Sequence, residues 1–158
     1  MTKVICIGQF TSSQREELER LRRRCKTIFA RIIAYAKRFY ETMREVNEIA
    51  LKYNVRFDWI RPLRSMMYLT EVIMRRRDEE IAEAIKGKSL EEARRIRRSI
   101  RRKYAKEIAI CLRNYYITRA LAQRIRILAN EGVIRGCYLL EIDEKLKREV
   151  EEILKRLT

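Results

Sequence analysis

The chain has 158 residues, 47% of them hydrophobic, and its 38 Lys and Arg residues outnumber 22 Asp and Glu residues to give a formal net charge of +16, with no His. This hydrophobic content is enough for one packed domain and excludes an intrinsically disordered chain. The absence of His excludes Ser-His and Cys-His catalytic triads and imidazole-dependent metal sites. No apolar run approaches the ~18 residues of a membrane span, so we expect a soluble, unexported protein.

The first predicted element is one long helix over residues 14–53. Apolar side chains recur at steps of three and four from Leu18 to Tyr53, and no Gly or Pro interrupts the run. Ser13, followed three residues later by Glu16, matches a capping box. At ~1.5 Å per residue the helix would be ~60 Å long, more than a compact globule of this size needs.

A second helix is predicted over residues 62–86. The segment NVRFDWIRP, residues 54–62, breaks the periodicity, and Pro62 suits the first helical position because its missing N–H is not needed there. Gly87 is the expected stop. Within the helix, three Arg at 75–77 precede three acids at 78–80, which favours internal ion pairs over a binding site.

A basic helical region is predicted over residues 90–131. Ser89 and Glu92 form a second capping-box pattern, and no Gly or Pro follows until Gly132. A short last helix over 144–157 follows Asp143 as its cap.

The stretch GVIRGCYLLEI, residues 132–142, contains two Gly and a β-rich run, and the N-terminal VICI is expected to pair with CYLLEI in a minor β element. The expected fold class is therefore all-α, a long-helix bundle with a minor β element near the N-terminus and at 133–142. Because no linker composition or repeat is visible, we expect residues 1–158 to form a single helical unit.

The four Cys, at positions 6, 25, 111 and 137, are expected to be buried small apolar residues. Their spacing contains no C-x-x-C pair, so a zinc ribbon is excluded. A disulfide between Cys6 and Cys137 is conceivable, because both lie in the strand-like stretches.

The positive charge is concentrated in residues 94–126, where twelve basic residues face one acid, Glu107, for a local charge of +11. Of the 38 basic residues 27 are Arg, whose guanidinium matches paired phosphate oxygens. A helix this basic is costly unless it lies along phosphates or acids elsewhere in the fold compensate it. The candidate nucleic-acid-binding residues here are Arg94, Arg95, Arg97, Arg98, Arg101, Arg102, Lys103 and Lys106.

A second candidate stripe is formed by Arg24, Arg31 and Arg38, which are seven residues apart and lie on one flank of the first helix. Two interpretations stay open for it. The stripe contacts phosphates, or it pairs with acids of another helix, as flank positions of helical seams often do.

The segment EIAICLRNYYITRALAQRIRILANEGVIRGCYLLEID, residues 107–143, resembles the winged helix-turn-helix of the leucine-responsive regulator family. The similar pattern is E-I-A-x-x-L, a turn at RNYYI, then L-A-Q-R-I-x-x-L-x-x-E-G-V-I-R-G. The resemblance implies a recognition helix at 118–130, with Arg135 on the wing. Its DNA-facing side chains would be Arg119, Gln123, Arg124 and Arg126.

As a whole, the chain is similar to the major coat (nucleocapsid) proteins of filamentous viruses of hyperthermophilic archaea. The similarity rests on the long first helix, the Arg-rich RRIRRSIRRK helix and the break at Pro62. It implies a small helical protein that wraps linear double-stranded DNA.

We therefore expect a structural nucleoprotein that packages double-stranded DNA by sequence-independent phosphate contacts and self-assembly, in a virion assembled in the host cytoplasm. The alternatives are a sequence-specific helix-turn-helix regulator, cytoplasmic and nucleoid-associated, and a small helical subunit of an RNA-guided defence ribonucleoprotein. No catalytic or metal-binding constellation, glycine-rich phosphate loop, cofactor or small-molecule substrate is expected.

Overall fold

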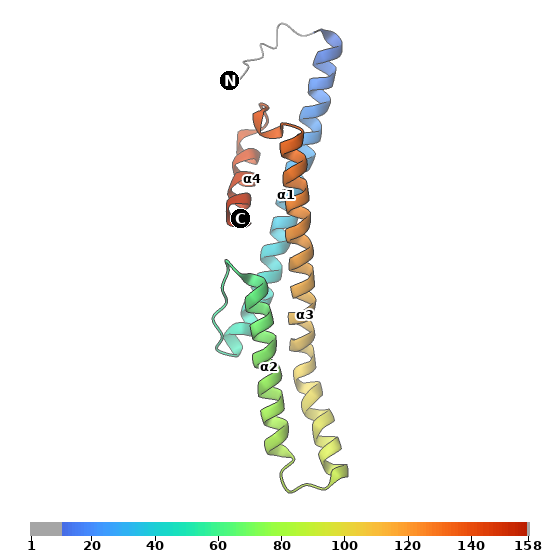
Figure 1. Cartoon of the computed structure of the whole chain (residues 1–158), viewed down its shortest axis with the longest axis vertical. Coiled ribbons are helices and arrows are strands. Elements are labelled where there is room, and N and C mark those ends of the chain that lie inside the picture. The colour runs from blue at the N-terminus through green and yellow to red at the C-terminus, as the bar shows by residue number, and fades with distance from the viewer. Residues whose placement is uncertain (1–10, 158) are drawn as a thin grey trace. The chain divides into compact units, whose positions relative to one another are not determined.

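The computed structural model describes residues 11–157, and the regular elements in this range are all helical. They are α1 (Ser12–Lys52), α2 (Pro62–Ala84), α3 (Leu90–Ile134), the short 3₁₀ helix η2 (Cys137–Leu139) and α4 (Glu144–Leu157) (Figure 1). The four α-helices begin and end within three residues of the ranges expected from the sequence. The all-α fold class is thus confirmed.

Local side-chain and backbone contacts explain where the helices begin. Ser89 Oγ accepts the backbone N–H of Glu92 at 3.2 Å, and Asp143 Oδ1 accepts that of Lys145 at 3.0 Å, as expected for these two caps. At the start of α1 the reciprocal capping box joins Thr11 and Gln14, with bonds of 3.2 and 2.9 Å, two residues before the expected Ser13 pair. Pro62 lies in the first turn of α2.

Helix α1 ends where Asn54 adopts a left-handed conformation with φ of 58°. The N–H of Val55 then bonds back to the carbonyl of Ala50 at 2.9 Å, which satisfies one of the last free carbonyls of the helix. Between α2 and α3, Gly87 has φ of 70°, and an L side chain would be strained there.

The expected β element at 133–142 is not formed. Helix α3 continues through Gly132 to Ile134, and the chain then turns at Gly136 (φ 70°) into η2. The reason lies in the backbone: Gly136, and not Gly132, adopts the left-handed conformation that ends a helix, so α3 runs on through Gly132. The N-terminal VICI lies outside the described residues.

The turn expected at RNYYI is also absent, because α3 runs unbroken from Leu90 to Ile134. Asn114, in the middle of that stretch, is 1% exposed and lies on the buried side of the helix. Its amide donates to the carbonyl of Thr42 at 3.4 Å and to Glu45 Oε2 at 3.1 Å. The side chain that looked like a turn residue is therefore satisfied inside a continuous helix, and no helix-turn-helix forms at 107–134.

The chain divides into two compact units. The first, unit 1, combines the chain up to Lys37 with the chain from Gln123 onward, and the second, unit 2, comprises Arg38–Ala122. Helices α1 and α3 each contribute to both units. Since we expected one unit over residues 1–158, the division into two by packing is a new observation.

Unit 1 is held together by a covalent bond. Cys25 on α1 and Cys137 in η2 form a disulfide with Cα atoms 5.4 Å apart, so Cys137 does not pair with Cys6 as we had considered. Next to it, the rings of Phe29 and Tyr138 lie 5.4 Å apart. Figure 1 shows α4 folding back after η2. The fully buried side chains of this unit include Cys25, Phe29, Ile32, Ile125, Cys137 and Val150.

Unit 2 packs α2 against the first part of α3, and both against the end of α1. Figure 1 shows α2 and this part of α3 side by side, and the turn that joins them contains Gly87. Cys111 is fully buried, and burial raises the pKa of its thiol to about 11. The core of the unit consists mainly of Met43, Val46, Met66, Leu69, Ile73 and Cys111.

Candidate nucleic-acid interface

The basic residues at the start of α3 form a continuous exposed surface on unit 2. Arg94, Arg98, Arg102 and Lys106 follow one another at intervals of four, so they form a ridge along the helix with a rise of ~6 Å between neighbours. Arg97 and Arg101 flank this ridge and are also exposed. We call these six residues the α3 basic surface.

Within residues 11–157, none of the six side chains of the α3 basic surface forms an ion pair. The two other candidates in this stretch do. Arg95 lies 3.3 Å from Glu91, one turn earlier on the same helix, and Lys103 lies 2.9 Å from Glu80 on α2. The structure thus separates eight similar residues into six unpaired cations and two paired ones.

Two acids that contact this part of α3 or lie on it are already engaged. Glu80 accepts hydrogen bonds from the Tyr104 hydroxyl and the Lys103 ammonium, and these bonds hold the pKa of its carboxyl below the ordinary value. Glu107 accepts from the Tyr53 hydroxyl at 2.8 Å and from Lys52 Nζ at 3.1 Å. Neither carboxylate is therefore free to neutralise the six cations.

These contacts also fasten the three helices of unit 2 to one another. Tyr53 directly follows the end of α1, its partner Glu107 lies on α3, and the guanidinium of Arg76 on α2 lies 5.1 Å from the Tyr53 ring centre. Burial and the bond to Glu107 raise the pKa of Tyr53, so its hydroxyl stays protonated as a donor. This polar cluster contacts the side of α3 that faces the other helices, and it therefore anchors this very basic helix within unit 2.

The stripe on α1 is divided between two roles. Arg24 lies 3.5 Å from Glu131 on α3, within unit 1, which supports the interhelical interpretation for this residue. Further along the same row, Glu45 pairs with Arg113 at 3.1 Å and Lys52 with Glu107 at 3.1 Å, within unit 2. Arg31 and Arg38 are exposed and form no ion pair within residues 11–157.

The residues of the expected recognition helix are exposed on α3, but not as part of a helix-turn-helix. Arg119 belongs to unit 2, whereas Gln123, Arg124 and Arg126 belong to unit 1. The guanidinium of Arg124 lies 5.8 Å from the ring centre of Tyr35 on α1. Arg135, expected on a wing, instead pairs with Glu131 at 3.2 Å at the end of the helix. The helix-turn-helix that would present these side chains to a groove is not formed.

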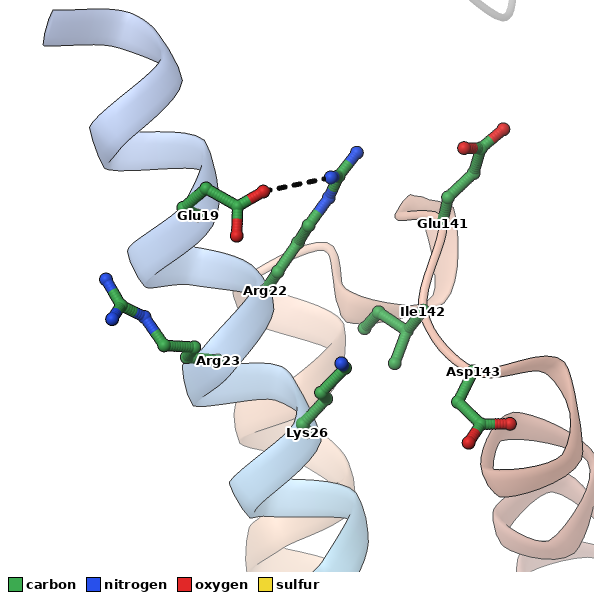
Figure 2. A pocket seen from close by; sticks show the side chains of 7 residues that line it. All are labelled: Glu19, Arg22, Arg23, Lys26, Glu141, Ile142 and Asp143. Atoms are coloured by element: carbon green, nitrogen blue, oxygen red, sulfur yellow. Dashed lines mark hydrogen bonds and ion pairs between the residues drawn. The ribbon is translucent and has the colours of Figure 1, made fainter.

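A second polar cluster lies in unit 1, in a pocket between α1 and the segment before α4. Figure 2 shows Arg22, Arg23 and Lys26 on α1, with Glu141 and Asp143 across the pocket, and the dashed line marks the 3.2 Å ion pair from Arg22 to Glu19. Charges of both signs line the pocket. The mixture makes it a weaker candidate for binding a polyanion than the α3 basic surface.

One exposed feature was missed in the sequence. Tyr116 is 64% exposed and Leu112 is 42% exposed on the outer side of α3. A signal was available: Tyr115 and Tyr116 are adjacent, and successive residues of a helix point about 100° apart, so both cannot lie on one buried seam.

Residues 11–157 contain neither a candidate membrane span nor a candidate metal cluster. None of the helices in this range is both long and apolar enough to span a membrane. In the same range, no group of three or more His, Cys, Asp or Glu side chains is arranged to hold a metal ion.

Comparison with known proteins gives no relative. No protein-family model matches the chain, and no curated protein or solved structure is significantly similar to it.

Proposed function

We propose that this protein is a structural nucleic-acid-binding protein that coats double-stranded DNA by contacting its phosphates without reading the bases. The observation that carries the proposal is the α3 basic surface, with six exposed cations unpaired within residues 11–157 on one side of a helix. Repulsion among these charges is relieved when a polyanion lies along them.

The dimensions of the surface suit a duplex. Its span from Arg94 to Lys106 corresponds to ~18 Å of helix axis. A DNA duplex carries one negative charge per ~1.7 Å, so a segment of that length presents about ten phosphate charges. Five of the six cations are Arg, which binds phosphate oxygens in pairs and remains charged at any physiological pH.

Sequence-independent binding is favoured over base readout. Base readout by a helix requires side chains that enter a groove, and the helix-turn-helix that would have presented Arg119, Arg124 and Arg126 is not formed. Arginines along the outer side of a helix are instead suited to contacts with the phosphate backbone of DNA.

The proposal is tested by filter binding of the full chain to several unrelated duplexes over a salt series. Binding through six phosphate contacts should give nearly equal affinities and a log–log salt slope of about −5. A preference of ~10³ or more for one duplex would contradict it. Preference for a single-stranded RNA or an RNA–DNA hybrid in direct competition would assign the surface to an RNA-guided complex instead.

A matched pair of triple variants localises the contacts. Replacing Arg94, Arg98 and Arg102 by Ala should reduce the slope by about 2.7, because three contacts are lost. Replacing Arg44, Arg64 and Arg148 by Ala removes the same charge from exposed positions outside the α3 basic surface and should change the slope much less. Equal effects of the two variants would mean that binding follows net charge alone.

We further propose that the nucleoprotein is a viral coat, with DNA packaged in a filamentous virion assembled in the host cytoplasm. This rests on the long helices and the localised charge. Electron microscopy of the protein mixed with linear duplex tests it: uniform filaments with internal DNA are expected, and irregular aggregates or dispersed single complexes would contradict it.

A further inference from the structure

The outer side of α3 changes character along its length. From Ala105 onward the exposed apolar positions on the same side are Ala105, Ala109, Leu112 and Tyr116, at steps of four, three and four. This is the spacing of a helical seam, yet in unit 2 no element covers it: Leu112 is 42% and Tyr116 64% exposed. An apolar stripe of this kind on a charged helix is suited to packing against another protein surface.

We call Ala105, Ala109, Leu112 and Tyr116 the outer seam of α3. Basic residues border it. Lys106 and Arg119 lie beside it, are exposed and form no ion pair within residues 11–157. A partner for the seam must therefore offer apolar contacts together with acids. Two copies of the seam facing each other would bring like charges together, which costs free energy.

The exposed side of α2, in the same unit, offers both apolar contacts and acids. It carries a shallow hollow in which Met74 and Ala82 provide the apolar lining and Glu71 and Glu79 are exposed carboxylates. Met67 and Tyr68, closer to the start of α2, are 54% and 53% exposed. Neither Glu71 nor Glu79 forms an ion pair within residues 11–157. We call this surface the α2 acidic face; the complete lining of the hollow is Glu71, Met74, Arg75, Asp78, Glu79 and Ala82.

We propose that the outer seam of α3 in one copy of the chain binds the α2 acidic face of a second copy. Leu112 and Tyr116 fill the hollow between Met74 and Ala82, and Arg119 approaches the carboxylates of Glu71 and Glu79, which leaves Lys106 with the α3 basic surface. The two surfaces differ, so each copy that uses one of them still presents the other. A head-to-tail contact of this kind produces a ring if its rotation closes and an open helical filament if it does not.

This inference deepens the proposed function, since a filament is what a DNA coat requires, but the contact itself needs no nucleic acid. It uses the middle of α3 and leaves the outer ridge at the start of the helix, Arg94, Arg98 and Arg102, free for phosphates. Assembly and DNA binding can therefore be measured separately.

The experiment is sedimentation velocity of the full chain without nucleic acid over a concentration series. Wild-type protein should show a sedimentation coefficient that rises with concentration. One variant, Leu112→Glu with Tyr116→Glu, destroys the seam, and another, Glu71→Arg with Glu79→Arg, reverses the α2 acidic face. Each should weaken self-association on the order of 30-fold or more.

Mixing the two variants gives the decisive result. The first retains an intact α2 acidic face and the second an intact seam, so the mixture should form a 1:1 heterodimer that cannot grow further. A mixture that stays monomeric would overturn the head-to-tail contact, as would a wild-type protein that is monomeric throughout or variants that associate normally.

Two controls keep the outcome interpretable. Leu51→Glu with Glu48→Arg makes comparable changes at exposed positions of α1 outside both faces and should leave association unchanged. Circular dichroism checks that each variant is folded, and Leu112→Ser with Tyr116→Ser replaces the glutamate variant if it is not. Filter binding of the Leu112→Glu, Tyr116→Glu variant to a short duplex should keep most of the wild-type salt slope, which separates failure of this contact from failure of DNA binding.

Discussion

Lys103 on α3 donates a hydrogen bond of 2.9 Å from its ammonium group to Oε1 of Glu80 on α2. In the sequence Lys103 is indistinguishable from the basic residues around it, but the structure assigns it to a contact between helices. The carboxylate of Glu80 raises the pKa of this ammonium, as expected for a cation held by an acid. Lys106, three residues later, is exposed and has no such partner within residues 11–157.

The first prediction compares these two lysines. Lys106→Ala should reduce the slope of log affinity against log salt by about 0.9, since one phosphate contact is lost. Lys103→Ala should change the slope much less, because this charge is already neutralised in the free protein. Filter binding to one duplex at four or more salt concentrations measures both, and a larger effect from Lys103 would contradict the assignment.

The second prediction concerns acid stability. Hydrogen bonds from Tyr104 and then Lys103 lower the pKa of Glu80 in the folded state below its ordinary value of 4.5. The unfolded chain therefore binds this proton more readily, so the stabilisation is present above pH 4.5 and is lost as the pH falls through the lowered folded pKa. Glu80→Gln should lower the melting temperature at neutral pH and flatten its dependence on pH in the acid range.

Thermal unfolding followed by circular dichroism across a pH series measures this effect. Glu48→Gln is the matched control, because Glu48 is exposed on α1 and forms no ion pair within residues 11–157. It should reproduce the wild-type curve. If Glu80→Gln also reproduced it, the link between Glu80 and acid unfolding would be wrong.

The third prediction uses two buried threonines with opposite surroundings. The hydroxyl of Thr118 is buried without a hydrogen-bond partner in the described part of the chain, whereas that of Thr42 donates to the carbonyl of Arg38 at 2.7 Å. A buried unpaired hydroxyl costs about 1–3 kcal/mol. Thr118→Val should therefore increase the free energy of unfolding by about 1 kcal/mol, and Thr42→Val should not increase it. Urea unfolding measures both, and a loss of stability in Thr118→Val would contradict the prediction.

The fourth prediction concerns the disulfide between Cys25 and Cys137, which closes a loop with a sequence separation of 112. By the chain-entropy relation, a cross-link that closes a loop of this size stabilises the folded state by about 4–5 kcal/mol. Adding a reductant should therefore lower the free energy of unfolding by about that amount. A Cys25→Ala, Cys137→Ala variant should be insensitive to reductant. Peptide mapping without reduction should recover the two cysteines in one linked peptide, and a link from Cys137 to any other cysteine would contradict the structure.

Local patterns in the sequence were sufficient to predict the helices. Apolar spacing, Pro62 and the caps at Ser89 and Asp143 act over a few residues, so they can be read without knowledge of the partners. The same local reading failed at 133–142 and at RNYYI. There Gly132 and Asn114 resembled breakers, but Gly132 lies within the continuous helix without a left-handed backbone, and Asn114 is buried and bonded to Glu45 on another helix.

The strong positive charge and its concentration at the start of α3 were determined by the sequence alone, because they are properties of composition and spacing. Which of those charges are free was decided only by the tertiary structure. Glu80 reaches Lys103 and Glu131 reaches Arg24 through the packing of helices whose contacting residues are 23 and 107 positions apart. The same packing leaves Leu112 and Tyr116 uncovered on α3, because the helices of unit 2 cover only one side of it, and this division into a buried, a basic and an apolar side is what supports both proposals.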